Sequence, residues 1–131
     1  MYNIYIIISL ILLKIMETLV KIDKTEENWI LIFAFEWELD ETNVDSTFKW
    51  IYADLWDFSE KKVIFNMAWL TYINSKSIGY IADIYSNLED NKWKMYISNC
   101  SVWVKDILDL VWITQIVPTV DTIEDAVSAM S

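Results

Sequence analysis

The chain has 131 residues and contains one glycine, Gly79, beside eight tryptophans. Tight turns and helix ends use glycine where the backbone becomes left-handed, and ordinary usage of about 7% would supply roughly nine glycines. The surplus tryptophans nearly equal the missing glycines in number. A chain of this composition must build its turns from residues that carry a Cβ, which costs roughly 1–2 kcal/mol at each left-handed position.

Several tryptophans stand where a turn or an element end is expected: Trp29, Trp37, Trp69, Trp93 and Trp112. Trp29 follows Asn28, and Asn-Gly is the strongest short signal for a hairpin. Trp112 follows the predicted end of a helix, where glycine is favoured. Some bacterial lineages read the UGA codon as glycine, and other codes read it as tryptophan. We hypothesise that most or all of the eight residues are glycine in the organism; the alternative is a genuinely tryptophan-rich protein.

Composition excludes several classes of function. With 20 acidic and 10 basic side chains the formal charge is −10, which argues against a nucleic-acid partner. The chain has no histidine, so histidine-dependent hydrolase dyads and histidine zinc sites are excluded. Its single cysteine, Cys100, cannot form an internal disulfide or a cysteine cluster, and its place after a strand suggests a small buried side chain. We therefore predict no catalytic residue, metal or cofactor.

The first residues form a separate apolar run, at positions 4–13. It is shorter than the roughly 20 residues that span a bilayer, and it lacks the flanks of a signal peptide. It could be a membrane-peripheral anchor, an extra element packed on the domain, or an upstream stretch wrongly included. The third reading fits best because a strand pattern begins just after Met16. We expect residues 1–15 to be an extension and residues 16–131 to be one domain, cytoplasmic and without stable membrane insertion.

Hydrophobic periodicity predicts an α/β fold. Strand-like runs lie at residues 18–23, 30–36, 62–67, 94–97 and 113–117. Helical patterns lie at residues 44–55, 78–88, 104–111 and after 121, with expected N-terminal caps at Thr42, Ser101 and Asp121. The first two strands would form a hairpin, and strands then alternate with helices. This order predicts a mixed sheet of about five strands, largely parallel after the hairpin, with about four helices.

Four motifs in order carry a family resemblance when tryptophan is read as glycine. They are Trp37-Glu-Leu-Asp40, the central segment 68–79, the helix segment 104–113 and the helix opening 121–126. So read, the chain from about Met16 onward resembles the STAS family of anti-sigma factor antagonists. The resemblance implies a STAS-like mixed sheet and a regulatory role without catalysis.

In that family a serine in the central segment is phosphorylated, and the resemblance places this role on Ser75. Independently, Ser75 precedes a helix whose free N–H groups and dipole would favour a phosphate. The bland alternative is that Ser75 only caps this helix. We expect the partner-binding residues to be Asp40, Asn74, Lys76, Ser77 and Ile78. The sequence departs from the family pattern at Asn74, Lys76 and Ser77, where Asp, Ser or Thr, and Gly are usual.

The resemblance implies an anti-anti-sigma factor, a phosphoprotein of a partner-switching pathway that controls transcription. Its partners would be an anti-sigma factor with serine kinase activity and a cognate phosphatase. An alternative is a STAS-type structural subunit of a membrane lipid-transport complex, which docks on an ATPase constitutively and needs no phosphate.

Overall fold

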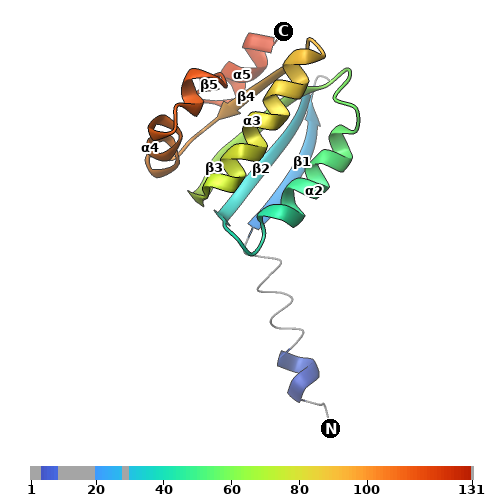
Figure 1. Ribbon diagram of the computed structural model, residues 1–131, viewed down its shortest axis with the longest axis vertical. Coiled ribbons are helices and arrows are strands. Elements are labelled where there is room, and N and C mark those ends of the chain that lie inside the picture. Colours follow the sequence, from blue (N-terminus) through green and yellow to red (C-terminus); the bar gives the residue numbers. More distant parts are fainter. Residues whose placement is uncertain (1–3, 9–19, 28–29, 131) are drawn as a thin grey trace.

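The computed structural model describes residues 4–8, 20–27 and 30–130. Its centre is a five-stranded sheet with the strand order β1-β2-β3-β4-β5 (Figure 1). The strands are β1 (Val20–Glu27), β2 (Ile30–Leu39), β3 (Lys62–Ile73), β4 (Lys94–Ser98) and β5 (Thr119–Val120). β1 is antiparallel to β2, and β2 to β5 run parallel. The predicted mixed sheet, parallel after an N-terminal hairpin, is confirmed.

Each parallel strand is followed by a helix. The helices are α2 (Val44–Leu55), α3 (Ser75–Asp90), α4 (Val102–Leu110) and α5 (Ile123–Met130), and a 3-10 helix, η1 (Ile113–Gln115), follows α4. Figure 1 shows α2 and α3 lying across the same face of the sheet. Because parallel strands need long crossover connections, the helices return the chain to the opposite end of the sheet each time. The loops that leave β2 and β3 therefore share one edge.

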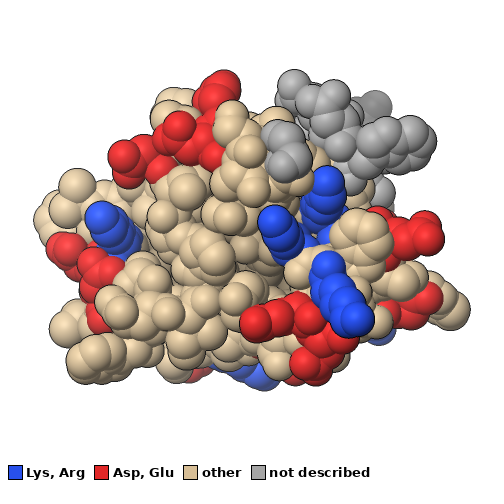
Figure 2. All heavy atoms as spheres, turned by 90° about the horizontal axis from the view of Figure 1, so that it is seen from above, with Lys and Arg blue, Asp and Glu red and all other residues tan. Residues whose placement is uncertain are grey.

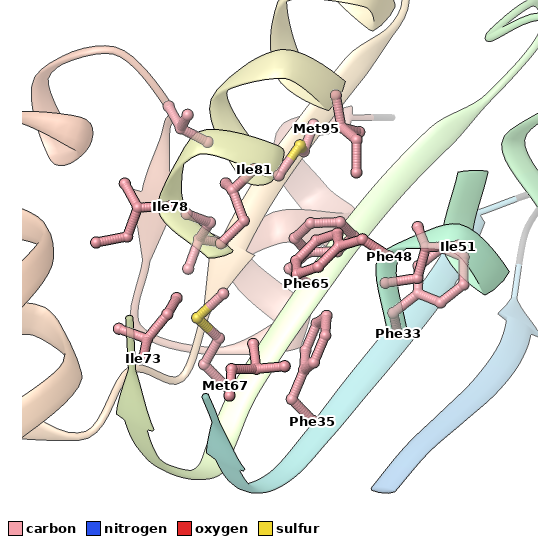
Figure 3. Packing of buried hydrophobic residues seen from close by; sticks show 14 of the residues in the cluster. Phe33, Phe35, Phe48, Ile51, Phe65, Met67, Ile73, Ile78, Ile81 and Met95 are labelled. Carbon is pink, nitrogen blue, oxygen red and sulfur yellow. The ribbon is translucent and has the colours of Figure 1, made fainter. Parts of the chain in front are cut away.

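The apolar run of β2 is buried on both faces of the sheet, as expected. On the face of α2 and α3, Phe33 and Phe65 are fully buried, with ring centroids 5.8 Å apart (Figure 3). On the other face, Ile32 and Ile64 belong to a cluster with residues of α5. Successive side chains of a strand point to opposite faces, so a strand covered on both sides has no polar alternation.

The predicted strand at residues 113–117 is wrong. Ile113–Gln115 forms η1, and the last strand is instead the pair Thr119–Val120. The chain turns tightly here because Ile116 N donates to Ile113 O at 2.9 Å, an i→i+3 bond. Pairing with β4 begins only at Pro118, whose carbonyl accepts from Ile97 N at 2.9 Å.

β2 and β3 continue through two tryptophans that were expected at or after the strand ends. Trp37 is 56% exposed and Trp69 is 71% exposed, so both lie outside the core as predicted. Their expected place at element ends is wrong, because irregular β2–β3 pairing lets both strands run on. Trp112 follows the C-cap of α4, as predicted. Trp29 lies outside the described residues.

The predicted helix caps are partly confirmed. The Ser101 hydroxyl accepts from Val104 N and caps α4. At α5 the cap is Thr122, not Asp121, because the Thr122 hydroxyl accepts from Asp125 N at 3.0 Å. At α2 the Thr42 hydroxyl instead donates to Asp40 at 2.6 Å, so Thr42 shapes the preceding loop.

Residues 4–8 form a short helical segment whose side chains are exposed. The expected boundary at Met16 lies outside the described residues, and the division into an extension and a domain stays a prediction. Within the described ranges, no helix has the length and apolar character needed to cross a membrane.

Candidate functional site

The candidate site lies where β2 and β3 end side by side. Leu39 pairs with Ile73 at the last position of the parallel ladder. One step further, Asn74 N donates to Leu39 O at 3.1 Å. Asp40 and Ser75 are each one residue beyond this bond. We call the loop Asp40–Asn43 together with the first turn of α3, Asn74–Ile78, the docking edge.

Asn74 is the N-cap of α3. Its side-chain oxygen accepts from Ser77 N at 2.9 Å and from the Ser77 hydroxyl at 2.6 Å. Its backbone is extended, with φ −93° and ψ 170°, as an N-cap residue requires. The alternative reading of Ser75 as the cap is therefore wrong. Since the side chain of Asn74 caps α3, the hydroxyl of Ser75 does not serve as the cap.

Ser75 is exposed and is the first residue of the 16-residue helix α3. Among the described residues, its hydroxyl has no hydrogen-bond partner. The first N–H groups of a helix have no partner within it, and the cap takes only that of Ser77. The N–H groups of Ser75 and Lys76, with the positive end of the helix dipole, form surroundings that favour an anion.

The opposite wall of the docking edge is a loop held by its own side chains. One oxygen of Asp40 accepts from Thr42 N at 2.9 Å and from the Thr42 hydroxyl. Asn43 accepts from Asp40 N at 3.0 Å and donates to Glu38 O at 2.8 Å. The hydrogen bonds from Thr42 lower the pKa of Asp40, so its carboxylate stays ionised. Asp40 thus acts first as a turn residue and presents a negative charge at this edge.

A charged contact joins α2 to the first turns of α3. Lys76 Nζ lies 2.8 Å from Asp45 Oδ1, and the Tyr80 hydroxyl donates to the same oxygen at 2.7 Å. The hydrogen bond from Lys76, followed by that from Tyr80, lowers the pKa of Asp45, and the same contact raises the pKa of Lys76. Sequence analysis missed Asp45 and Tyr80, because only the packing of α2 beside α3 brings them to Lys76.

The predicted partner-binding residues divide into two groups. Asp40, Asn74 and Lys76 come together at the surface of the docking edge. Ser77 is fully buried and Ile78 is 7% exposed. Ser77 holds the cap of α3, and Ile78 packs in the core beneath the site, so neither side chain is open to direct contact in this structure, and their part in partner binding stays a prediction.

Other candidate chemistry does not develop. Cys100 packs against the core, and desolvation raises the pKa of its thiol to about 11, so it is a poor nucleophile. The described part of the chain holds no cluster of three potential metal ligands. At the end of the sheet seen in Figure 2, opposite the docking edge, lysines lie among acidic and uncharged side chains. The described part of this face does not present the basic stripe of a nucleic-acid interface.

Comparison with known proteins gives one family and one fold. A family model described as the STAS domain matches residues 21–126. A Thermotoga maritima protein assigned as an anti-sigma factor antagonist is 20% identical, with a TM-score of 0.78, covering 83% of this chain and 93% of that one. A search of curated sequences finds no match.

Two further structures show how widely this fold is used. The phosphorylated form of the Bacillus cell fate determinant SpoIIAA is 15% identical, with a TM-score of 0.64, covering 86% of this chain and 99% of that one. The murine anion transporter Slc26a9 is 13% identical, with a TM-score of 0.72, covering 93% of this chain and 24% of that one. At these identities the likeness is one of fold.

Proposed function

Because the chain belongs to the STAS domain family, we propose that it is a regulatory binding module of the anti-sigma factor antagonist type, switched by phosphorylation of Ser75. Its partner is an anti-sigma factor with serine kinase activity, and a phosphatase resets it. The module binds this partner through the docking edge. It performs no catalysis itself, and its output is the availability of a sigma factor for transcription.

The observation that carries this proposal is that Asn74 and Ser75 have separate roles at the start of α3. Asn74 caps α3, while Ser75 stands exposed beside it on the first turn. A serine that capped the helix would have to give up a hydrogen bond before it could be phosphorylated. Here a kinase can phosphorylate the hydroxyl without disrupting the N-cap hydrogen bonds of α3. The modification therefore changes the surface and leaves the fold intact.

Phosphorylation would change the charge of the docking edge strongly. A phosphate adds about −1.5 to −2 charges at neutral pH. It would stand at the positive end of α3, where N–H groups can receive it, and beside Lys76. Lys76 already holds Asp45, so the phosphate would compete with a carboxylate for the same ammonium group. A partner that fits the unmodified docking edge would then contact an added negative charge and a Lys76 side chain in a different position.

The comparisons support this proposal by analogy. The name of the Thermotoga maritima relative is that of an anti-sigma factor antagonist, and SpoIIAA has a solved phosphorylated form. A chain of the same fold with an exposed serine at the start of α3 can support the same kind of switch.

The test is partner affinity, measured by calorimetry with a serine-kinase anti-sigma factor from the same organism. Ser75→Ala should keep binding and block phosphate incorporation, and it should change stability by less than about 0.5 kcal/mol because the exposed hydroxyl has no hydrogen bond to lose. Ser75→Asp should stay folded, because an acidic residue suits the first turn of a helix, and should bind more weakly. Ser86→Ala is the matched control, since Ser86 is exposed on the same helix away from its first turn. It should change neither binding nor phosphorylation.

If Ser75→Asp binds as tightly as the wild type and the kinase leaves Ser75 unmodified, the switch is refuted. The constitutive subunit of a lipid-transport complex then becomes the better account. In that case an ATPase encoded beside the gene should bind the chain, and Ser75→Asp should leave that binding unchanged.

A further inference from the structure

Three tryptophans have a backbone conformation that suits glycine. Among the residues that the structure describes, positive φ occurs at three of the seven tryptophans, Trp37, Trp56 and Trp112, and at four of all other residues. A bulky side chain at positive φ is an outlier in proteins. The single glycine, Gly79, lies inside α3 and makes no use of this freedom. Left-handed backbone is thus concentrated at tryptophan, the residue that is in surplus.

Trp37 interrupts the geometry of β2. Its φ is 74°, whereas strand residues normally have φ near −120°, and the pairing with β3 shifts register just after it. Its carbonyl accepts from the Thr71 hydroxyl at 3.0 Å. The ring is 56% exposed, so little packing offsets the strain. Glycine is the residue that irregular strand positions of this kind favour.

Trp56 occupies a turn position that glycine dominates. Its φ of 54° and ψ of −107° lie close to those of the first central residue of a type II′ turn, roughly +60° and −120°. The turn hydrogen bond is present, from Phe58 N to Leu55 O at 2.9 Å. Trp56 is 80% exposed. The position demands positive φ, and the side chain gains almost no contact in return.

Trp112 occupies the residue after the C-cap of α4, in left-handed conformation with φ 64° and ψ 13°. Its N–H donates to Asp109 O at 3.1 Å, the bond that closes a glycine-terminated helix. Its side chain is 70% exposed. At a comparable helix end, the left-handed residue after α3 is Lys92 and the partly buried Trp93 follows it, so the backbone makes no such demand at Trp93.

From these three positions we infer that residues 37, 56 and 112 are glycine in the natural protein. The codon is UGA, which the organism reads as glycine and another genetic code reads as tryptophan. The inference changes the surface near the docking edge. Trp37 and Trp69 line a shallow groove with Glu36 and Thr71, and glycine at position 37 removes one wall of it. That groove is then no ligand site of the natural protein.

The identity of the three residues can be read directly. The protein is isolated from its own cells, and its peptides across residues 37, 56 and 112 are sequenced by mass spectrometry beside the coding DNA. Glycine in the peptides with TGA in the gene is the expected result. Tryptophan in the peptides, or TGG codons at these positions, overturns the inference.

The backbone argument has its own test in recombinant protein of the printed sequence. Trp112→Gly should raise the melting temperature by roughly 3–5 °C, because it removes left-handed strain. Trp103→Gly is the matched control: Trp103 is 73% exposed, close to the 70% of Trp112, but it is the second residue of α4 and its φ is not positive. It should lower the melting temperature slightly, since glycine relieves no strain where φ is negative and is a poor helix former. Equal losses in both variants would overturn the backbone argument.

Discussion

Replacing Asn74 by Ala tests the arrangement on which the docking edge depends. The change removes the oxygen that accepts from Ser77 N at 2.9 Å and from the Ser77 hydroxyl at 2.6 Å. Loss of an asparagine N-cap costs about 1 kcal/mol, within a range of roughly 0.5–2. The Ser77 hydroxyl is fully buried, and leaving it unpaired costs a further 1–3 kcal/mol or so. Together these losses predict that the free energy of unfolding falls by about 2–4 kcal/mol.

The assay is urea unfolding followed by far-ultraviolet circular dichroism, with one shared slope for all variants. Asn74→Asp is the matched control, because a carboxylate keeps the acceptor and suits the positive end of α3. It should lie within about 0.5 kcal/mol of the wild type or above it. The double variant Asn74→Ala, Ser77→Ala removes both partners. It should recover about 1 kcal/mol of the loss, since no buried hydroxyl is left unpaired.

A loss below about 0.5 kcal/mol in Asn74→Ala would refute the cap. So would equal destabilisation by Asn74→Asp, because that variant retains the acceptor on which the reasoning rests. Strict additivity in the double variant would show that the Ser77 hydroxyl finds another partner once Asn74 is gone.

Three further outcomes follow from the structure. The pKa of Asp45 is lowered from its ordinary value of 3.8, so the ionised carboxylate stabilises the fold at pH values above 3.8, and this stabilisation is lost as the pH falls below it. The urea midpoint of Asp45→Asn should therefore fall less steeply below about pH 4 than that of the wild type. Phe65→Ala should lower the free energy of unfolding by about 3–5 kcal/mol, because the fully buried ring contacts Phe33 and Phe35 edge-on; a calorimetric loss under 1 kcal/mol would contradict this packing. Cys100 should react with a thiol reagent in native protein at pH 8 far more slowly than in urea, and equal rates would contradict its raised pKa and burial.

Helices and strands could be predicted from the sequence where their own hydrophobic pattern determines them. The apolar run of β2 predicts burial on both faces, and the faces of α2 and α3 follow from residues three and four apart. The prediction of the last strand failed because β5 depends on pairing with β4 and not on a pattern in its own residues. β5 has two residues and exists only because β4 offers a free edge, where Asn99 N donates to Val120 O. Residues 113–117, Ile-Thr-Gln-Ile-Val, resemble a strand, but after the left-handed turn at Trp112 the first three of them form η1.

The candidate site was predictable in part for the same reason. The motif and the start of a helix both point to the first turn of α3. The contact between Lys76 and Asp45 joins residues 31 positions apart, and no local pattern predicts it. It requires α2 and α3 to lie side by side on one face of the sheet, which is a property of the strand order.

Helical phase shows why Ser75 is exposed whereas Ser77 is buried. Ile81 and Ile84 are fully buried on the inner face of α3. Ser77 precedes them by four and seven residues, spacings that share one helix face, so it must also point inward. Ser75 lies two residues earlier, about 200° around the helix from Ser77, and must point away from the sheet. The spacing therefore buries Ser77 beneath the first turn of α3 and leaves Ser75 at the surface.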